Sequence, residues 1–214
     1  MLESMLLQSI NVGASETVVH VEKSFLTGIR KRPVSGPLRV NEKGIVNDAI
    51  VNSQHHGGVD QAIYAYSADD YEWWSAQLGQ VMLPGRFGEN LTIRGLPSDM
   101  NIGDRLLIGE VVLEATAPRI PCSTLAAEMQ DSEFGAVFRE AERPGVYFRV
   151  LNSGEITAGD YVTFVANNSV DVSVIDLFRF NYAPSHDPAT LRKYLDAPVA
   201  ARFRAKIENR LARL

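Results

Sequence analysis

The sequence has little cysteine, no surplus of positive charge and no long apolar run. Its 214 residues include a single cysteine, Cys122, which excludes an intramolecular disulfide scaffold. The formal charge of -5 argues against a dedicated nucleic-acid binder, because phosphate neutralisation needs a concentrated basic surface. No apolar run approaches the roughly 20 residues that span a bilayer, and Glu3 interrupts the first apolar stretch, unlike a secretory signal. We therefore expect a cytoplasmic protein with neither a membrane nor a nucleic-acid partner.

What is present is a globular composition whose pattern changes near residue 165. A content of 45% hydrophobic and 22% charged residues excludes disordered and coiled-coil classes. Most of the first 165 residues form short segments rich in β-branched and aromatic residues between turn residues, which is typical of a barrel or sandwich. After a polar stretch at 166–169, three segments carry helix start signals. The sequence predicts a mainly β, barrel-like domain over residues 1–165, followed by a small three-helix domain over residues 170–214.

Individual elements follow from local patterns. Strands are expected where β-branched or aromatic residues gather, at 17–22, 44–50, 61–66, 105–108, 111–116, 146–151 and 161–165. Helices are expected at 68–78, where Ser67 and Asp70 fit a capping box, and at about 133–141. The three tail helices are expected to begin at these signals: Ser169 or Asp171, Asp187-Pro188, and Asp196 with Pro198.

The lone cysteine is the first candidate for chemistry. Cys122 follows Arg119 closely and precedes a segment that reads as the start of a short helix. A helix N-terminus and a guanidinium both stabilise a thiolate, the form that attacks electrophiles or binds soft metals. The alternative is an inert, buried, small apolar residue. The flanking residues alone leave both interpretations open.

Three other segments concentrate reactive or charged groups. The run His55-His56-Gly57-Gly58-Val59-Asp60 places two imidazoles beside glycines that allow close backbone approach to a ligand, although it lacks the spacing of a helical zinc motif. A turn with one hydrogen-bonded histidine is the competing interpretation. The glycine-bearing loop at 84–91 can present backbone N–H groups to an anion. The loop at 29–36 concentrates three cations, which suit a phosphate or simply face solvent.

Taken in order, these segments resemble the MOSC family, the domain found at the C-terminus of molybdenum cofactor sulfurases. The matching positions are residues 30–34, Asp48, His56-Gly57-Gly58 with Asp60 and Ala62, residues 87–91, Gly103-Asp104, residues 118–122, residues 145–151 and Gly159-Asp160. The tail resembles the small helical domain that follows MOSC in the YiiM-like branch. The chain departs from the family pattern at three places: Gln61 stands where Lys is common, Asn47 stands where Gly is usual, and Gln54-His55 precedes the His-Gly-Gly run.

The resemblance implies a cofactor and the residues that bind it. It implies a β-barrel-like domain that binds the molybdenum cofactor, with the Cys122 thiolate as the metal ligand. Pyridoxal phosphate is not expected on this chain. The positions expected to contact the cofactor are Arg30, Lys31, His56, Gly57, Gly58, Asn90, Arg119 and Cys122. If they form one site, then His56, Asn90, Arg119 and Cys122 must line one cleft although the sequence separates them widely.

The resemblance also implies a reaction. The YiiM-like branch is associated with reduction of N-hydroxylated compounds, including hydroxylaminopurine bases, to amines. We therefore expect a molybdenum-dependent oxidoreductase with catalytic residues Cys122, His56 and Asp60, the last two delivering protons. It would use a small N-hydroxylated substrate and a separate electron-donor protein. The second hypothesis, from a different class, is a carrier of sulfur or cofactor without turnover, partnered by a cysteine desulfurase. A Cys–His hydrolase built on Cys122 and His56 is a third alternative, and a homodimer is possible.

Overall fold

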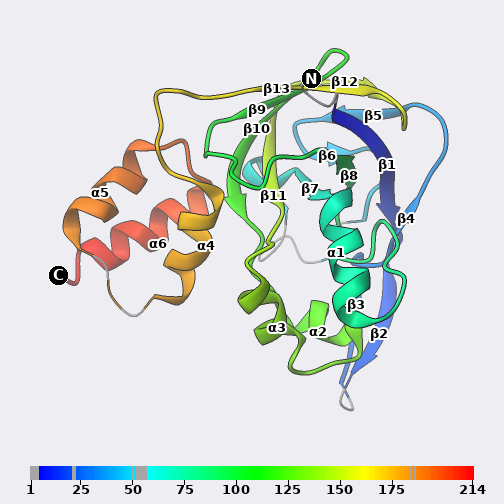
Figure 1. Ribbon diagram of the computed structural model, residues 1–214, viewed down its shortest axis with the longest axis horizontal. Helices are drawn as coiled ribbons and strands as arrows, with labels where there is room; N and C mark the ends of the chain where they lie inside the picture. The colour runs from blue at the N-terminus through cyan, green and yellow to red at the C-terminus, as the bar shows by residue number, and fades with distance from the viewer. Residues whose placement is uncertain (1–4, 21–22, 50, 52–56, 184, 186) are drawn as a thin grey trace.

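The computed structural model of the chain describes residues 5–20, 23–49, 51, 57–183, 185 and 187–214 (Figure 1). The strands are β1 (Met5–Gly13), β2 (Glu16–His20), β3 (Lys23–Thr27), β4 (Lys31–Pro33), β5 (Leu38–Asn41), β6 (Gly44–Ile45), β7 (Ile63–Ser67), β8 (Leu91–Arg94), β9 (Arg105–Ile108), β10 (Val111–Pro118), β11 (Val146–Asn152), β12 (Gly154–Ile156) and β13 (Tyr161–Val165). The helices are the short 3-10 helix η1 (Val59–Gln61) and α1 (Ala68–Leu78), α2 (Ser123–Met129), α3 (Phe134–Ala141), α4 (Val174–Tyr182), α5 (Pro188–Asp196) and α6 (Ala201–Leu211).

Seven strands close into a barrel in the order β13-β9-β10-β11-β7-β8-β1. The circle closes where β1 pairs with β13 and Met5 lies opposite Val162. All neighbours are antiparallel except β7 and β8, which are parallel and are joined by α1. A parallel pair needs a crossover connection of this kind. The expected barrel-like fold with helices after it is confirmed.

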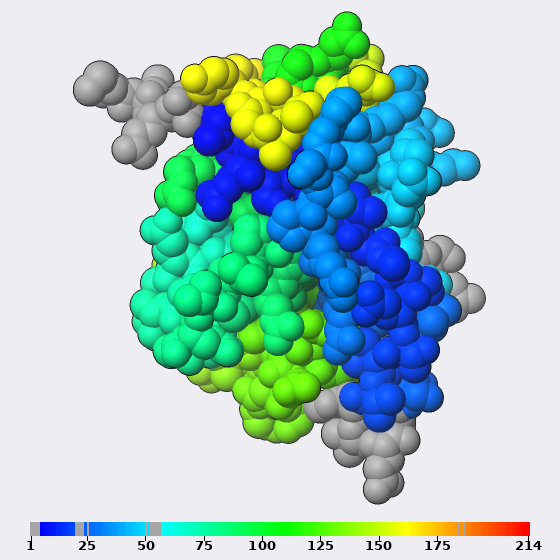
Figure 2. Space-filling model, turned by 90° about the vertical axis from the view of Figure 1, so that its right-hand side faces the viewer, coloured from blue at the N-terminus to red at the C-terminus, as the bar shows by residue number. Residues whose placement is uncertain are grey.

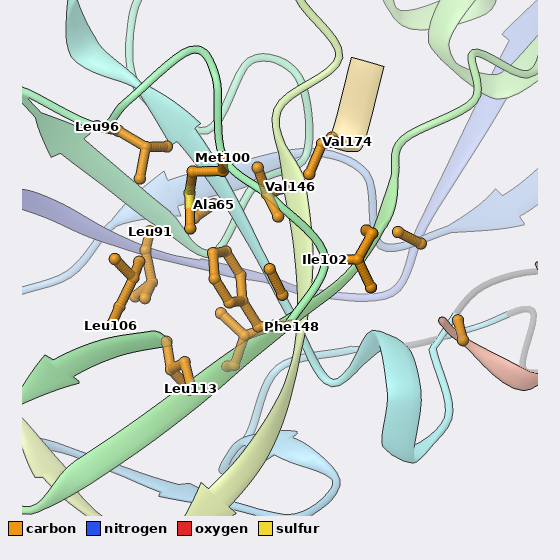
Figure 3. Packing of buried hydrophobic residues seen from close by; sticks show 14 of the residues in the cluster. Ala65, Leu91, Leu96, Met100, Ile102, Leu106, Leu113, Val146, Phe148 and Val174 are labelled. Carbon is orange, nitrogen blue, oxygen red and sulfur yellow. The ribbon is translucent and has the colours of Figure 1, made fainter. Parts of the chain in front are cut away.

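The barrel core continues into the tail helices. Ala65 and Phe148 fill the barrel interior, and Met100 lies at the end that meets Val174, the first residue of α4 (Figure 3). The same apolar cluster includes Leu177 and residues of α5 and α6. The tail helices therefore pack against the barrel, as expected, and share its core. The division into two domains at 165–170 stays a prediction.

A second, aromatic cluster holds the helices that border the site. Trp74 of α1 packs on Phe87, Phe134 and Phe138, with its ring stacked on Phe138 at a centroid distance of 5.9 Å. This packing anchors α3, and α2 directly before it, to the barrel wall. Figure 2 shows the blue surface of the first strands running along one side of the molecule, with the yellow-green α2–α3 region beside its lower end.

Some local predictions were wrong. The strand expected over 44–50 is only the two-residue β6, because Asn47 adopts φ 72 in a turn. Asparagine tolerates this left-handed conformation better than most residues, and glycine tolerates it best. Ser173, with Asp176, forms the capping box of α4 instead of Ser169 or Asp171.

The structure also fixes where the other two tail helices begin. Asp187 caps α5 as expected, with Pro188 in its first turn. The third tail helix begins at Ala201 and not at Asp196, which is the last residue of α5. Within the described residues, no helix is long and apolar enough to cross a membrane.

Candidate functional site

Cys122 lies at the start of α2, at the end of the short segment 119–122 that connects β10 to this helix. It is the N-cap residue of this helix, and its carbonyl accepts hydrogen bonds from Leu125 N (3.0 Å) and Ala126 N (3.3 Å). The residue is partly exposed and borders a cavity of about 320 Å³. The cavity wall combines loop, strand and 3-10 helix residues from distant parts of the sequence, including Gly28, Lys31, Asp48, Gly57, Gln61, Tyr64, Gly88, Asn90, Arg119 and Tyr147.

Most of the cleft expected from the sequence exists. Asn90, Arg119 and Cys122 all border this one cavity. His56 lies outside the described residues, and its neighbour Gly57 lies in the cavity wall. Three widely separated motifs therefore meet at a single thiol.

Arg119 is a buried cation beside the thiol. Its side chain is only 5% exposed, its Nη1 donates to the carbonyl of Phe87 at 2.7 Å, and its guanidinium lies 5.2 Å from the ring centroid of Tyr64. Burial alone lowers the pKa of Arg119, but neighbouring Tyr147, Tyr64 and Cys122 raise it above its ordinary value. The guanidinium thus stays charged, and a permanent positive charge here favours the thiolate form of Cys122.

Lys31 belongs to a network that crosses the cavity wall. Its ammonium group forms an ion pair with Asp48, and Asn90 Nδ2 donates to the same carboxylate at 2.8 Å. Asn90 Oδ1 accepts a hydrogen bond from Tyr64 N at 3.2 Å. Burial lowers the pKa of Lys31, although the charge of Asp48 acts in the opposite direction. The network fixes Lys31 and Asn90 as polar groups of the wall.

Glu89 holds the glycine-bearing loop in place. This fully buried carboxylate accepts hydrogen bonds from Gly85 N (2.5 Å), the Tyr71 hydroxyl (2.8 Å) and the Thr92 hydroxyl (2.8 Å). The loop then brings Gly88, at φ +76, against the segment before β4, where an added Cβ would lie 3.0 Å from Ile29 Cγ1. Glycine allows both the conformation and the close approach.

Arg30 lies outside the cavity wall. Its Nε donates to the buried carboxylate of Glu128 at 2.7 Å, and Arg86 Nη1 donates to the other oxygen of Glu128 at 2.6 Å. A weaker contact joins Arg30 to Glu16 at 3.7 Å. Arg30 therefore helps to tie α2 to the neighbouring loops, and the direct cofactor contact expected for it stays a prediction.

Asp60 and Gly58 are likewise absent from the described cavity wall. The Asp60 carboxylate contacts Arg149 Nη2 at 3.0 Å and accepts a hydrogen bond from Ala201 N at 2.8 Å. Gly58, at φ 89, is the residue before η1. The structure gives Asp60 a role in joining η1 to α6, and its expected role in proton delivery stays a prediction.

Sequence reasoning did not single out several wall residues. Tyr64 and Tyr147 place their rings 4.9 Å apart in the wall. Gln61, which the sequence marked as a departure from the family pattern, also lines the cavity. The tyrosines sit on β7 and β11, which pair in the barrel. Alternating aromatic residues on two strands signal a core as readily as a site, so only the strand pairing reveals that they face this cavity.

The chain is similar to a family model, to curated proteins and to solved structures. The MOSC domain model matches residues 52–163. The uncharacterised protein YflK of Bacillus subtilis (strain 168) is 29% identical over 208 residues, which cover 96% of this chain and 94% of that protein. A protein named "Reductase" from Gibberella moniliformis is 30% identical over 159 residues, or 72% of this chain and 28% of that protein. The crystal structure of YiiM from Geobacillus stearothermophilus matches with a TM-score of 0.80 at 28% identity, covering 97% of this chain and 99% of that one.

Proposed function

Because this chain belongs to the MOSC domain family, we propose that its cavity binds the molybdenum cofactor and that the Cys122 thiolate is the protein ligand to the metal. MOSC domains are associated with binding of this cofactor. The single observation that carries the proposal is the partly exposed Cys122 thiol beside the buried Arg119 in a cavity wall.

The groups of the wall fit such a cofactor. Molybdenum is a metal for which a soft thiolate is a suitable ligand. The buried Nε of Arg119 has no hydrogen-bond partner among the described residues, so it can still donate to a bound group. Lys31 and Arg119 supply positive charge for an anionic cofactor. The volume of about 320 Å³ lies within the roughly 300–1,000 Å³ typical of small-molecule sites.

The proposed reaction is the reduction of an N-hydroxylated compound to its amine. Two electrons and two protons convert R–NHOH to R–NH₂ and water, and the electrons come from a separate donor protein. When bound, the molybdenum cofactor supplies two-electron redox chemistry. The relative named "Reductase" supports this reaction class, and since this chain matches only 28% of that protein, a donor separate from this chain is consistent with it.

The residues of the chain have distinct roles in this proposal. Cys122 holds the metal, Arg119 supplies a positive charge beside the thiol, and the network of Lys31, Asp48 and Asn90 positions an anionic part of the ligand. His56, next to Gly57 of the wall, is the proposed proton donor. A cytoplasmic location and a homodimer stay predictions.

Substitution of Cys122 tests the proposal. Protein produced in a cofactor-synthesising host should contain molybdenum by elemental analysis, and Cys122→Ala should lose both the metal and reduction of 6-hydroxylaminopurine with an artificial reductant. Cys122→Ser is sharper, because it keeps the side-chain size but replaces a soft, ionisable sulfur by a hydroxyl that stays protonated near pH 7. Ser153→Ala, at an exposed loop residue, is the control and should retain metal and activity.

Each contrary result has a definite meaning. Metal-loaded wild type that reduces no N-hydroxylated compound, yet passes cofactor or sulfur to a partner, identifies a carrier. Activity that survives in Cys122→Ala contradicts both functions, because each depends on that thiolate.

A further inference from the structure

The first turn of α6 is fixed against η1 and β10. Ala201 N donates to Asp60 Oδ2 at 2.8 Å, and Ala200 N donates to the carbonyl of Thr116 on β10 at 3.0 Å. Arg149 Nη2 joins η1 to the segment before α6, since it lies 3.0 Å from Asp60 Oδ1 and donates to the carbonyl of Pro198 at 3.0 Å. The start of α6 therefore keeps a defined position relative to η1.

This placement brings Arg202 to the rim of the cavity. Arg202 is the second residue of α6 and is exposed, and its Nη1 donates to Gln61 Oε1 at 3.2 Å. Gln61 is part of the cavity wall. Burial raises the pKa of Tyr147, another wall residue, and the charge of Arg202 is near enough to act in the opposite direction. A guanidinium from the tail helices thus stands at the cavity that holds Cys122.

The other wall cations are less accessible to a ligand at the rim. Lys31 is paired with Asp48, and Arg119 is buried with its Nη1 on a backbone carbonyl. Arg202, in contrast, is exposed to solvent. A guanidinium presents parallel N–H donors that match two oxygens of a phosphate, and a fixed backbone lowers the entropy cost of using them.

We propose that Arg202 is a specificity-determining residue of this site, forming an oxyanion subsite at the cavity rim for the phosphate of a phosphorylated N-hydroxylated substrate. The inference rests on the proposed function and deepens it, because it selects nucleotides over free bases and nucleosides. Gln61 orients the guanidinium, and η1 and α6 together form the subsite. The cofactor also carries a phosphate, so the two sources need separate tests.

Binding without turnover tests the subsite. In the absence of any reductant, calorimetric titration of the full-length protein should give a dissociation constant for 6-hydroxylaminopurine riboside 5′-monophosphate about tenfold below that for the riboside, since charge-assisted hydrogen bonds are the stronger kind. Arg202→Ala should abolish this preference. Arg213→Ala removes an exposed arginine just beyond the other end of α6 and should retain the preference.

Moving the charge is the most discriminating variant. In the Arg202→Ala background, Gln61→Lys places a cation on the same rim from η1 and should restore the preference for the monophosphate. Restoration shows that charge at this point, and not the fold of α6, selects the phosphate.

The outcomes separate the two phosphate sources and the two proposals. Equal affinity of the wild type for both compounds, no binding of either, or a preference that survives Arg202→Ala overturns the subsite. Loss of bound molybdenum in Arg202→Ala, with the preference unchanged, assigns the guanidinium to the cofactor and overturns the substrate assignment. Failure of metal-loaded wild type to reduce either compound with reductant present refutes the proposed function, while the binding preference still reports on Arg202.

Discussion

Glu128 is a single residue on which two loops of the cavity depend. Its carboxylate is 5% exposed and binds Arg30 from one loop and Arg86 from another, while Arg86 Nη2 also donates to the Glu128 carbonyl at 3.1 Å. Glu128 lies in α2, which begins at Cys122. The carboxylate therefore sets the position of the thiol relative to both loops.

We predict that Glu128→Ala lowers the free energy of unfolding and weakens retention of molybdenum. Breaking a fully buried ion pair costs about 3–5 kcal/mol, but the two arginines are about 40% exposed and can turn to water, so we expect roughly 1–2 kcal/mol. Urea denaturation measures the change, and elemental analysis measures the metal. Glu140→Ala, at an exposed position of α3, is the matched control. Equal stability of the two variants would contradict the role of Glu128.

At the scale of elements, close backbone approach places the loops of the wall. A Cβ on Gly13, at the end of β1, would overlap the Gly28 carbonyl oxygen, and a Cβ on Gly28 would overlap the Ala49 carbonyl oxygen. Gly28 and Ala49 both border the cavity. Three backbone segments thus lie in contact without side chains between them.

Two glycine substitutions should change the stability of the fold in opposite directions. Gly28→Ala must push backbone segments apart, so we expect a loss of about 1–3 kcal/mol of stability, the range for overpacking. Gly135→Ala, within α3, meets nothing within 4 Å and should stabilise by about 0.5–1 kcal/mol, because alanine favours the helix. Chemical denaturation of both variants checks the pair. If Gly28→Ala left the free energy of unfolding unchanged, the backbone segments would be able to separate without cost, contrary to this prediction.

Local patterns predicted some elements well and others not at all. The helix α1 has the expected bounds because Ser67 caps it, accepting from Asp69 N and Asp70 N, and Gly79 ends it at φ 63. Asp70 instead pairs with Arg143, a partner far along the chain that no capping rule contains. The strand β1 went unpredicted, since it is buried through contacts with β8 and β13 that lie outside any local window.

The same limit applies to the site. Cys122, Arg119 and Asn90 were identified because each stands in a distinctive local motif. The hydrogen bond between Gln61 and Arg202 joins residues 141 positions apart, and neither local sequence predicts the other as its partner. Tertiary contacts of this kind decide which polar residue faces a cavity and which, like Asp60, holds two elements together.

At the scale of the whole molecule, buried tyrosines make stability sensitive to alkali. Burial raises the pKa of Tyr64, Tyr66, Tyr71 and Tyr147 above the ordinary value of 10. Above pH 10 the unfolded chain therefore loses these protons while the folded chain keeps them, so stability is present below pH 10 and is lost as the pH rises. The lowered pKa of Lys31 acts oppositely, because there the unfolded chain holds the extra proton.

We predict a steep fall in unfolding free energy above pH 10. The tyrosines with raised pKa, Tyr182 and Tyr194 among them, outnumber the lysines with lowered pKa, Lys31 and Lys206. Each tyrosine that keeps its proton only in the folded chain contributes up to about 1.4 kcal/mol per pH unit to the fall. Urea denaturation between pH 9 and 11 measures the slope, and Tyr66→Phe should make it shallower by about 1.4 kcal/mol per pH unit. Tyr161→Phe, at a residue 73% exposed, should leave the slope unchanged. A flat profile up to pH 11 would refute this account.

The closure of the barrel by β1 and β13 also orders events during synthesis. The partner of Met5 is Val162, about 160 residues later, and at roughly 5–20 residues per second a ribosome needs about 8–30 s to reach it. Until then β1 has an open edge towards β13, although its pairing with β8 can already form. Cys122 and Arg119 are thus made before the barrel can close, and the closed barrel forms only after β13 has left the ribosome.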